Sequence, residues 1–198
     1  MKRNAAIVAG TLAMLIGLGG YARGQDQTAK PAPAAPAAPQ GAPATPPQAR
    51  PADVDSVEHI LAATYDVISG PPGQRDWDRF RSLFSTGARL VATGRNDKGN
   101  IIMHDLSVED YVKAAGDYLT KNGFFENSIA NRIESWDHMA EVWSTYESRH
   151  AKGEKPFARG VNSFQLFFDG TRWWVVTIYW EDENADHPLP EKYLSNNK

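Results

Sequence analysis

Residues 134–182, ESWDHMAEVWSTYESRHAKGEKPFARGVNSFQLFFDGTRWWVVTIYWED, decide the fold of this chain. Three runs in this stretch alternate in the manner of β-strands, and they cover residues 139–150, 160–168 and 172–180. Short polar segments join them, AKGEKP at residues 151–156 and the Asp169-Gly170 pair. Alternating runs joined by such segments are typical of β-hairpins. The stretch therefore predicts an antiparallel meander.

Amphipathic segments precede the meander. Apolar side chains at three- and four-residue steps predict a helix that starts near Asp53 and ends at the breaker Ser-Gly-Pro-Pro-Gly at 69–73. Its apolar face holds Val54, Val57, Leu61, Tyr65 and Ile68, and either Asp53 or Asp55 is expected to cap its start. Asp76 begins a second, short helix, and Ser107 begins a third that stops at Asn122. Strands are expected at 88–93, 100–106 and 124–136.

The predicted order is helix, helix, strand, strand, helix and then about four long strands. This order indicates an α+β fold in which three N-terminal helices pack on one face of a strongly curved antiparallel sheet.

The N-terminal quarter of the sequence has a different composition. Residues 1–24 join a basic start to a short apolar run and small residues, which predicts a signal peptide cleaved near Gly24. An uncleaved membrane anchor is the alternative, but the apolar run is shorter than the ~20 residues of a spanning helix. Residues 25–52 are rich in Pro and Ala and predict a disordered linker. The folded domain is expected to occupy residues 53–198, in a periplasmic or secreted protein.

Charge and cysteine content exclude several classes of function. The chain has 24 acidic and 21 basic residues, and cleavage would remove Lys2, Arg3 and Arg23. An acidic chain without a basic stripe argues against nucleic acid as a partner, and against a membrane once the signal peptide is removed. Because the chain has no Cys, it has no disulfide and no thiolate chemistry.

Several segments resemble the nuclear transport factor 2-like superfamily, which includes SnoaL-like and lumazine-binding-like proteins. The resemblance lies in DWDRFRSLF at 76–84 with ARLV at 88–91, in AEVWSTYE at 140–147, and in GVNSFQL at 160–166 with WWVV at 173–176. It extends over residues 53–182 and is closest to exported, uncharacterised members. It implies a cone-shaped, cystatin-like fold with an internal pocket. The catalytic sets of the superfamily's ketosteroid isomerase and epoxide hydrolase members have no counterparts here residue by residue, so the resemblance implies no activity.

Strand alternation indicates which side chains face the cone. Ala140, Val142, Ser144 and Tyr146 share the small and apolar face of their strand, so this face is expected to be concave. On the last strand, the alternation places Trp174, Val176, Ile178 and Trp180 together. Aromatic walls with a few polar groups are typical of small-molecule sites, although the same residues could form an ordinary core. The predicted pocket residues are Tyr65, Trp77, His104, Tyr111, Tyr118, Tyr146, Asn162 and Trp180.

Catalytic residues are not identified by any motif. His104 and His138 each lie beside an aspartate, but adjacent residues on a strand point to opposite faces, so neither forms an oriented pair. Because the sequence lacks H-x-H and H-E-x-x-H spacings, we expect no metal site and no cofactor.

Both faces of the last strand are apolar, which predicts that a second subunit covers the outer face of the sheet in a homodimer. Three functions remain open. The first is binding of an unknown small molecule, and the second is a SnoaL- or ketosteroid-isomerase-type enzyme with a buried His or carboxylate as general base. The third is a protein-interaction module whose cone is filled.

Overall fold

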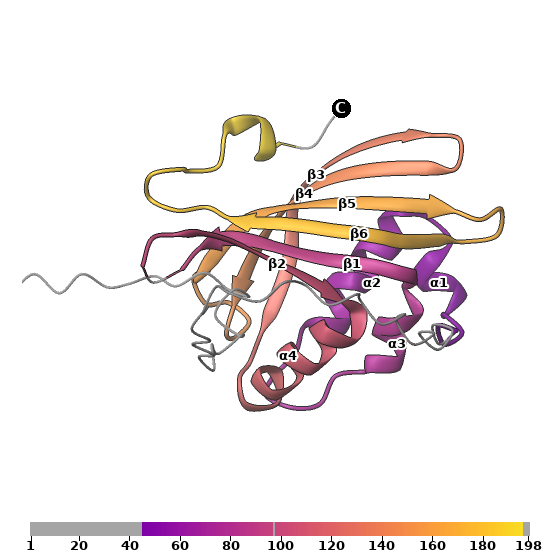
Figure 1. The fold of residues 1–198 in the computed structure, drawn as a ribbon, viewed down its shortest axis with the longest axis horizontal. Helices are drawn as coiled ribbons and strands as arrows, with labels where there is room; N and C mark the ends of the chain where they lie inside the picture. The colour runs from indigo at the N-terminus through magenta and orange to yellow at the C-terminus, as the bar shows by residue number, and fades with distance from the viewer. Residues whose placement is uncertain (1–44, 97, 196–198) are drawn as a thin grey trace, which may run out of the picture.

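The computed structural model describes residues 45–96 and 98–195. The predicted signal peptide and most of the predicted linker lie outside this part. In chain order (Figure 1), the elements are α1 Pro51–Val54, α2 Val57–Ile68, α3 Trp77–Ser82, β1 Phe84–Arg95, β2 Ile101–Ser107, α4 Val108–Lys121, β3 Phe125–Trp136, β4 Met139–Arg149, β5 Ala158–Phe168, β6 Trp173–Asp182 and the 3₁₀ helix η1 Glu191–Tyr193. Among the described helices, none is long and apolar enough to cross a lipid bilayer.

The six strands form one curved sheet in the order β2-β1-β6-β5-β4-β3. The predicted meander is confirmed, because β3, β4, β5 and β6 pair successively and antiparallel. The β1–β2 hairpin joins this meander through β6, and the β1–β6 pair is parallel. The α+β prediction is thus confirmed, with one parallel pair in a sheet that was expected to be antiparallel throughout.

Each longer helix begins at a side-chain cap. Ser56 accepts a hydrogen bond of 3.1 Å from the backbone N–H of His59 at the start of α2, so neither aspartate expected there is the cap. Asp76 caps α3 as predicted. Ser107 and Asp110 form a reciprocal capping box at the start of α4, which satisfies two backbone donors that the helix itself leaves unpaired.

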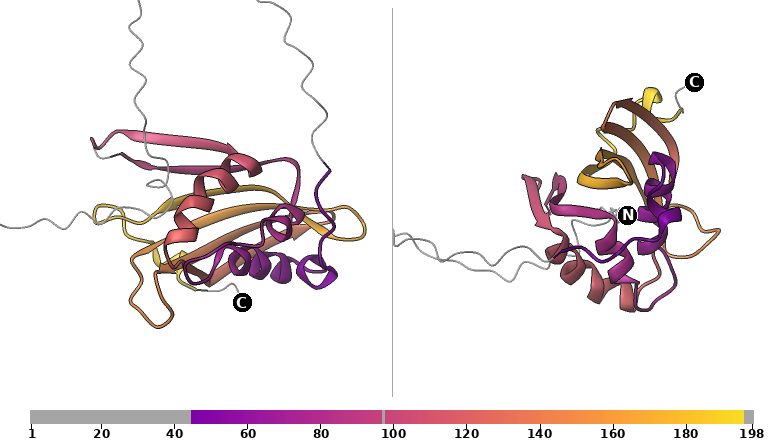
Figure 2. Two further views of the ribbon diagram at one scale, coloured as in Figure 1. Left: turned by 90° about the horizontal axis from the view of Figure 1, so that it is seen from below. Right: turned by 90° about the vertical axis from the view of Figure 1, so that its right-hand side faces the viewer.

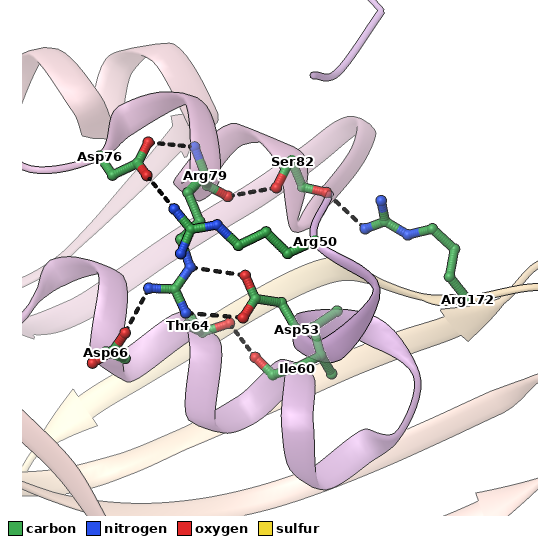
Figure 3. A network of polar contacts seen from close by, with 9 residues as sticks. All are labelled: Arg50, Asp53, Ile60, Thr64, Asp66, Asp76, Arg79, Ser82 and Arg172. Atoms are coloured by element: carbon green, nitrogen blue, oxygen red, sulfur yellow. Dashed lines mark hydrogen bonds and ion pairs between the residues drawn. The ribbon is translucent and has the colours of Figure 1, made fainter. Parts of the chain in front are cut away.

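Asp53 instead anchors an ion-pair network that holds the N-terminal helices together (Figure 3). Arg79 of α3 donates two hydrogen bonds to the Asp53 carboxylate, at 2.8 and 2.9 Å, and a third to Asp66 of α2 at 2.5 Å. Arg50 pairs with Asp76 nearby, at 2.9 Å. The hydrogen bond from Arg79 holds the pKa of Asp53 below its usual value. One arginine therefore ties α1, α2 and α3 into one unit.

The core lies between the helices and the concave face of the sheet (Figure 2). Ala140, Val142, Ser144 and Tyr146 of β4 are all buried, as the alternation predicts. The prediction for β6 is wrong in part, because Val175 joins Ile178 and Trp180 on the buried face. Gln165 pairs with Thr177 and Leu166 pairs with Val175, so a bulge at Val176 reverses the alternation there.

The C-terminal segment after β6 returns over the convex face of the sheet (Figure 1). Thr145 donates a hydrogen bond to the carbonyl oxygen of Tyr193, and the rings of Trp143 and Tyr193 lie 5.5 Å apart. Thr145 is fully buried as a result. The chain's own tail therefore covers part of the outer face on which a second subunit was expected.

Candidate functional site

A cavity of about 50 Å³ lies between α2, α3 and α4 and the concave face of the sheet. Seven of its thirteen lining residues are aromatic. They are Thr64, Tyr65, Ile68, Phe80, Leu90, Tyr111, Phe124, Glu126, Tyr146, Asn162, Phe164, Ile178 and Trp180.

Hydrogen bonds connect the end of α2 to the start of β3. They position Glu126, whose carboxylate lines the cavity. Gly70 and Phe124 exchange two backbone hydrogen bonds, of 2.7 and 3.0 Å. The Ser69 hydroxyl accepts from the backbone N–H of Glu126 at 3.0 Å. It also lies 2.7 Å from the carbonyl oxygen of Tyr65, to which it donates. Glu126 is thus held by its backbone against the helix that carries Tyr65.

Glu126 is the only carboxylate among the described residues that line the cavity. Ser148, which pairs with it across β3 and β4, donates a hydrogen bond of 2.7 Å to Oε2. Burial raises the pKa of Glu126 to about 7, and the negative charge of Asp182 adds to the rise, while the Ser148 hydrogen bond opposes it. The carboxyl group therefore exchanges between its neutral and ionised forms near neutral pH.

Tyr65 of α2 reaches the sheet through its hydroxyl. The hydroxyl oxygen lies 2.7 Å from Oγ of Ser144 and accepts a hydrogen bond of 3.0 Å from Nδ2 of Asn162. These two partners face each other across β4 and β5. Burial raises the pKa of Tyr65, and the charge of Glu126 raises it further. The phenol is therefore a protonated, fixed polar group in the wall of the cavity.

Tyr146 of β4 lies across Gly160 of β5 and donates a hydrogen bond to Asp182 at the end of β6. A Cβ atom on Gly160 would lie 2.4 Å from the Tyr146 hydroxyl oxygen and 2.4 Å from the carbonyl oxygen of Glu181. The absence of a side chain at Gly160 is what allows the Tyr146 ring to cross the neighbouring strand. Burial raises the pKa of Tyr146, and Asp182 raises it further.

Tyr111 of α4 contributes a hydroxyl without a partner. Its ring stacks on Phe80 with centroids 5.1 Å apart, and its side chain is 5% exposed. Within residues 45–96 and 98–195, the hydroxyl makes no hydrogen bond. Burial raises its pKa, and so does the charge of Glu126, which places the two groups in one electrostatic environment. The Tyr111 hydroxyl is thus available to a molecule in the cavity.

Five of the eight predicted pocket residues line this cavity. They are Tyr65, Tyr111, Tyr146, Asn162 and Trp180. The other three lie elsewhere. Trp77 packs edge-on against Phe80, with centroids 5.6 Å apart, and is partly buried beside the core. Tyr118 is half-buried beside the core, and His104 lies on β2 opposite Ala92.

Sequence reasoning missed Glu126, and a bulge in β3 explains why. Trp136 pairs with Met139, and strict alternation backward from that hairpin would place Glu126 on the outer face. Ile129 is an extra residue, because Ser128 pairs with Tyr146 while Ala130 pairs with Thr145. Because of this bulge, the residues of β3 that precede it lie on the opposite face of the sheet from the one that strict alternation gives. Glu126 therefore faces the cavity. No local pattern in the sequence marks this bulge, so the position of Glu126 could not be predicted from the hairpin register.

A groove of about 690 Å³ lies between the end of β6 and the C-terminal tail. Trp180 lines both this groove and the cavity, so the two spaces adjoin at this residue. The charged residues that line the groove are Glu181, Asp182, Glu183 and Asp186 with Arg95. Its lining is therefore mainly acidic.

The described histidines do not form a catalytic centre with the cavity. None of them lines it. His138 lies 3.6 Å from Asp137 at an exposed hairpin turn, and His59 contacts Asp55 on the exposed side of α2. Across the described ranges, no group of three or more His, Asp or Glu side chains could hold a metal ion.

Comparisons with known proteins identify the fold. No family model and no curated protein matches the chain. A protein of unknown function with a cystatin-like fold from Nostoc punctiforme matches with a TM-score of 0.51 and 11% identity, over 65% of this chain and 90% of that chain.

Two further solved structures are described as NTF2-like proteins of unknown function. The one from Silicibacter pomeroyi has a TM-score of 0.45 and 9% identity, over 65% of this chain and 94% of its own. The one from Shewanella baltica has a TM-score of 0.41 and 13% identity, over 65% of this chain and 91% of its own. The match to the Nostoc punctiforme protein, at 11% identity, speaks for the fold and not for function. The chain has the cystatin-like fold that the resemblance of its sequence implies.

Proposed function

We propose that this domain binds a small, partly apolar molecule in the cavity between its helices and the concave face of its sheet. The observation that carries the proposal is the composition of the walls, in which aromatic rings surround Glu126 and an unpartnered Tyr111 hydroxyl. Such a combination of apolar surface and few polar groups is typical of small-molecule sites.

The size of the cavity limits the ligand. A volume of about 50 Å³ corresponds to about four water molecules at ~10–15 Å³ each, well below the ~300 Å³ of a drug-sized site. We therefore expect a ligand with few non-hydrogen atoms. A larger one would require movement of a wall residue such as Trp180, which lines both the cavity and the groove.

A thermal-shift screen of the full chain against small metabolites tests the proposal. A ligand at a hundred times its dissociation constant adds about 2.7 kcal/mol of stability, which raises the melting temperature by several degrees. Thr64→Met, which extends a wall residue into the cavity, is expected to abolish the shift, whereas Ile129→Met on the exposed bulge should leave it intact. A shift that survives Thr64→Met would place the ligand elsewhere and contradict the proposal.

Proton-transfer catalysis is a second candidate, and Glu126 is the observation that favours it. A general base works best when its pKa lies near the working pH, and burial raises the pKa of Glu126 to about 7. In this reaction, the ionised carboxylate would take a proton from a carbon next to a carbonyl group and return it to the same molecule. The chemistry is that of the SnoaL- or ketosteroid-isomerase-type enzyme.

Solvent exchange distinguishes catalysis from binding alone. If Glu126 acts as a base, a bound carbonyl ligand incorporates deuterium from heavy water at the adjacent carbon, which proton NMR detects. Glu126→Gln should stop the exchange while the ligand still binds. Exchange at an unchanged rate in Glu126→Gln would exclude this role, and binding without exchange would leave the domain as a binding protein.

We also propose that the protein is exported, from the composition of residues 1–24. N-terminal sequencing of the protein from the producing cell should find a start near Gln25, and an intact Met1 would contradict export with cleavage.

A homodimer remains our proposal for the assembly. Trp136, Met139, Phe167 and Trp174 lie opposite one another in one row across β3, β4, β5 and β6. The first three side chains are 78%, 58% and 44% exposed. This apolar row lies beyond the area that the C-terminal tail covers, and it supports contact with the same row of a second copy.

A further inference from the structure

We propose that the ligand of the cavity is a small organic cation, an amine whose ammonium group pairs with Glu126 while its apolar part contacts the aromatic walls. This inference rests on the proposed function and adds the chemical class of the ligand.

The first argument is a missing positive charge. Within the described residues, no Lys, Arg or His lines the cavity, and Glu126 forms no ion pair. The groups that act on its carboxyl are the Ser148 hydroxyl and the negative Asp182. A buried carboxylate without a counter-charge costs free energy. An ammonium group would supply that charge, whereas an anionic ligand would add repulsion.

The second argument is the chemistry of the walls. Seven aromatic residues line the cavity, and the face of an aromatic ring attracts a cation. The Tyr111 hydroxyl oxygen lacks a partner among the described residues and can accept a hydrogen bond from an ammonium N–H, as can the Glu126 oxygen that Ser148 does not contact. The cavity thus offers both acceptors and π-faces, which suit an amine better than a neutral alcohol.

The third argument is the acidic groove, which shares the lining residue Trp180 with the cavity. Glu181, Asp182 and Asp186 line it, and they outnumber its one Arg, Arg95. A surface of one sign raises the local concentration of ions of the other sign. The groove would therefore favour the approach of a cation and disfavour that of an anion.

Binding of an amine should depend on the ionisation of Glu126. The titratable groups whose charge or hydroxyl faces this carboxyl are Tyr65 of α2, Tyr111 of α4, Tyr146 of β4 and Asp182 of β6. The three phenols are protonated near neutral pH, and burial raises their pKa values further above that range. Amine affinity should therefore increase as pH rises from 6 to 8 through the pKa of about 7 of Glu126.

The test compares three probes with equal numbers of non-hydrogen atoms, isopropylammonium, 2-propanol and acetate, by isothermal titration calorimetry with the full chain at pH 8. We expect isopropylammonium to bind about tenfold or more tightly than 2-propanol, which is about 1.4 kcal/mol, and acetate not to bind. Glu126→Gln should reduce the affinity for the amine to that for the alcohol. Asp186→Asn removes one acidic charge from the groove and should weaken amine binding far less than Glu126→Gln does.

The outcomes separate this inference from the proposed function. Equal affinity for the amine and the alcohol, with both lost in Thr64→Met, would leave a binding cavity and overturn the amine as its ligand. Amine binding that Asp186→Asn abolishes and Glu126→Gln does not would place the cation in the groove and also overturn it. Failure of all three probes would overturn the amine class, while the metabolite screen with Thr64→Met decides the proposed function separately.

Discussion

Glu126 is the residue on which the chemistry of the cavity depends, and its stability effect has a definite sign. Its pKa is raised from about 4.5 in the unfolded chain to about 7 in the folded one, so the native state holds the proton more tightly. The stabilisation is complete below about pH 4.5 and is lost as pH rises through 7. The loss amounts to about 3 kcal/mol.

The variant Glu126→Gln isolates this effect, because glutamine keeps an acceptor for Ser148 but does not titrate. We expect the stability of the wild type, measured relative to that of Glu126→Gln, to fall by about 3 kcal/mol between pH 4.5 and 8. Urea unfolding of both proteins across that range measures the difference. A difference that does not change with pH would mean that Glu126 is not held in a buried, uncompensated state.

Gly160 gives a second prediction at the same scale. The Cβ of an alanine there would meet the Tyr146 hydroxyl and a backbone carbonyl, and the backbone cannot move aside as a flexible side chain can. Gly160→Ala should cost about 2 kcal/mol of unfolding free energy by overpacking. Gly94→Ala is the matched control, since Gly94 lies on a strand with open space around its Cβ position. Equal stability of the two variants in urea would contradict the close passage of Tyr146 over β5.

The positions of some of these residues could be predicted from the sequence and those of others could not, for physical reasons. Tyr146 and Asn162 could be placed on the concave face because regular alternation holds around them. Glu126 could not, because a bulge at Ile129 lies between it and the hairpin that sets the register of β3. The Tyr146–Asp182 contact depends on the packing of three strands, and no local pattern encodes it.

At the scale of elements, side-chain caps and ion pairs decide how the helices meet the sheet. The caps Asp76 and Ser107 could be predicted, because each acts within one turn of its own helix. The role of Asp53 could not, because its partner Arg79 is 26 residues away. The bulge at Val176 in β6 could not be predicted either, since both faces of that strand are mainly apolar and the alternation does not favour one register over the other.

Arg79 therefore carries a prediction about the helical unit. Its side chain is 15% exposed and that of Asp53 is 12% exposed, so Arg79→Met leaves a largely buried carboxylate unpaired. We expect a loss of about 3 kcal/mol in unfolding free energy. Arg50→Met is the control, because the Arg50–Asp76 pair is exposed on both sides and should contribute less than about 1 kcal/mol. A loss of similar size in both variants, measured by urea unfolding, would contradict the central role given to Arg79.

At the scale of the whole molecule, the convex face of the sheet is divided between the C-terminal tail and an exposed apolar row. We expect the protein to be a dimer in light scattering coupled to size exclusion. The double variant Met139→Lys with Phe167→Lys should convert it to a monomer, because it introduces two positive charges into the exposed apolar row. Met103→Lys, on exposed β2, should leave the dimer intact. A wild-type monomer at high concentration would exclude the proposed assembly.

Ligand binding inside the cavity is the central claim, and isoleucine methyl NMR tests it most directly. Ile68 and Ile178 line the cavity, while Ile101 and Ile129 are exposed outside it. When a ligand from the thermal-shift screen is added, we predict that the methyl signals of Ile68 and Ile178 shift and those of Ile101 and Ile129 do not. Shifts confined to the two exposed isoleucines would show that the molecule binds on the surface and would contradict the proposed function.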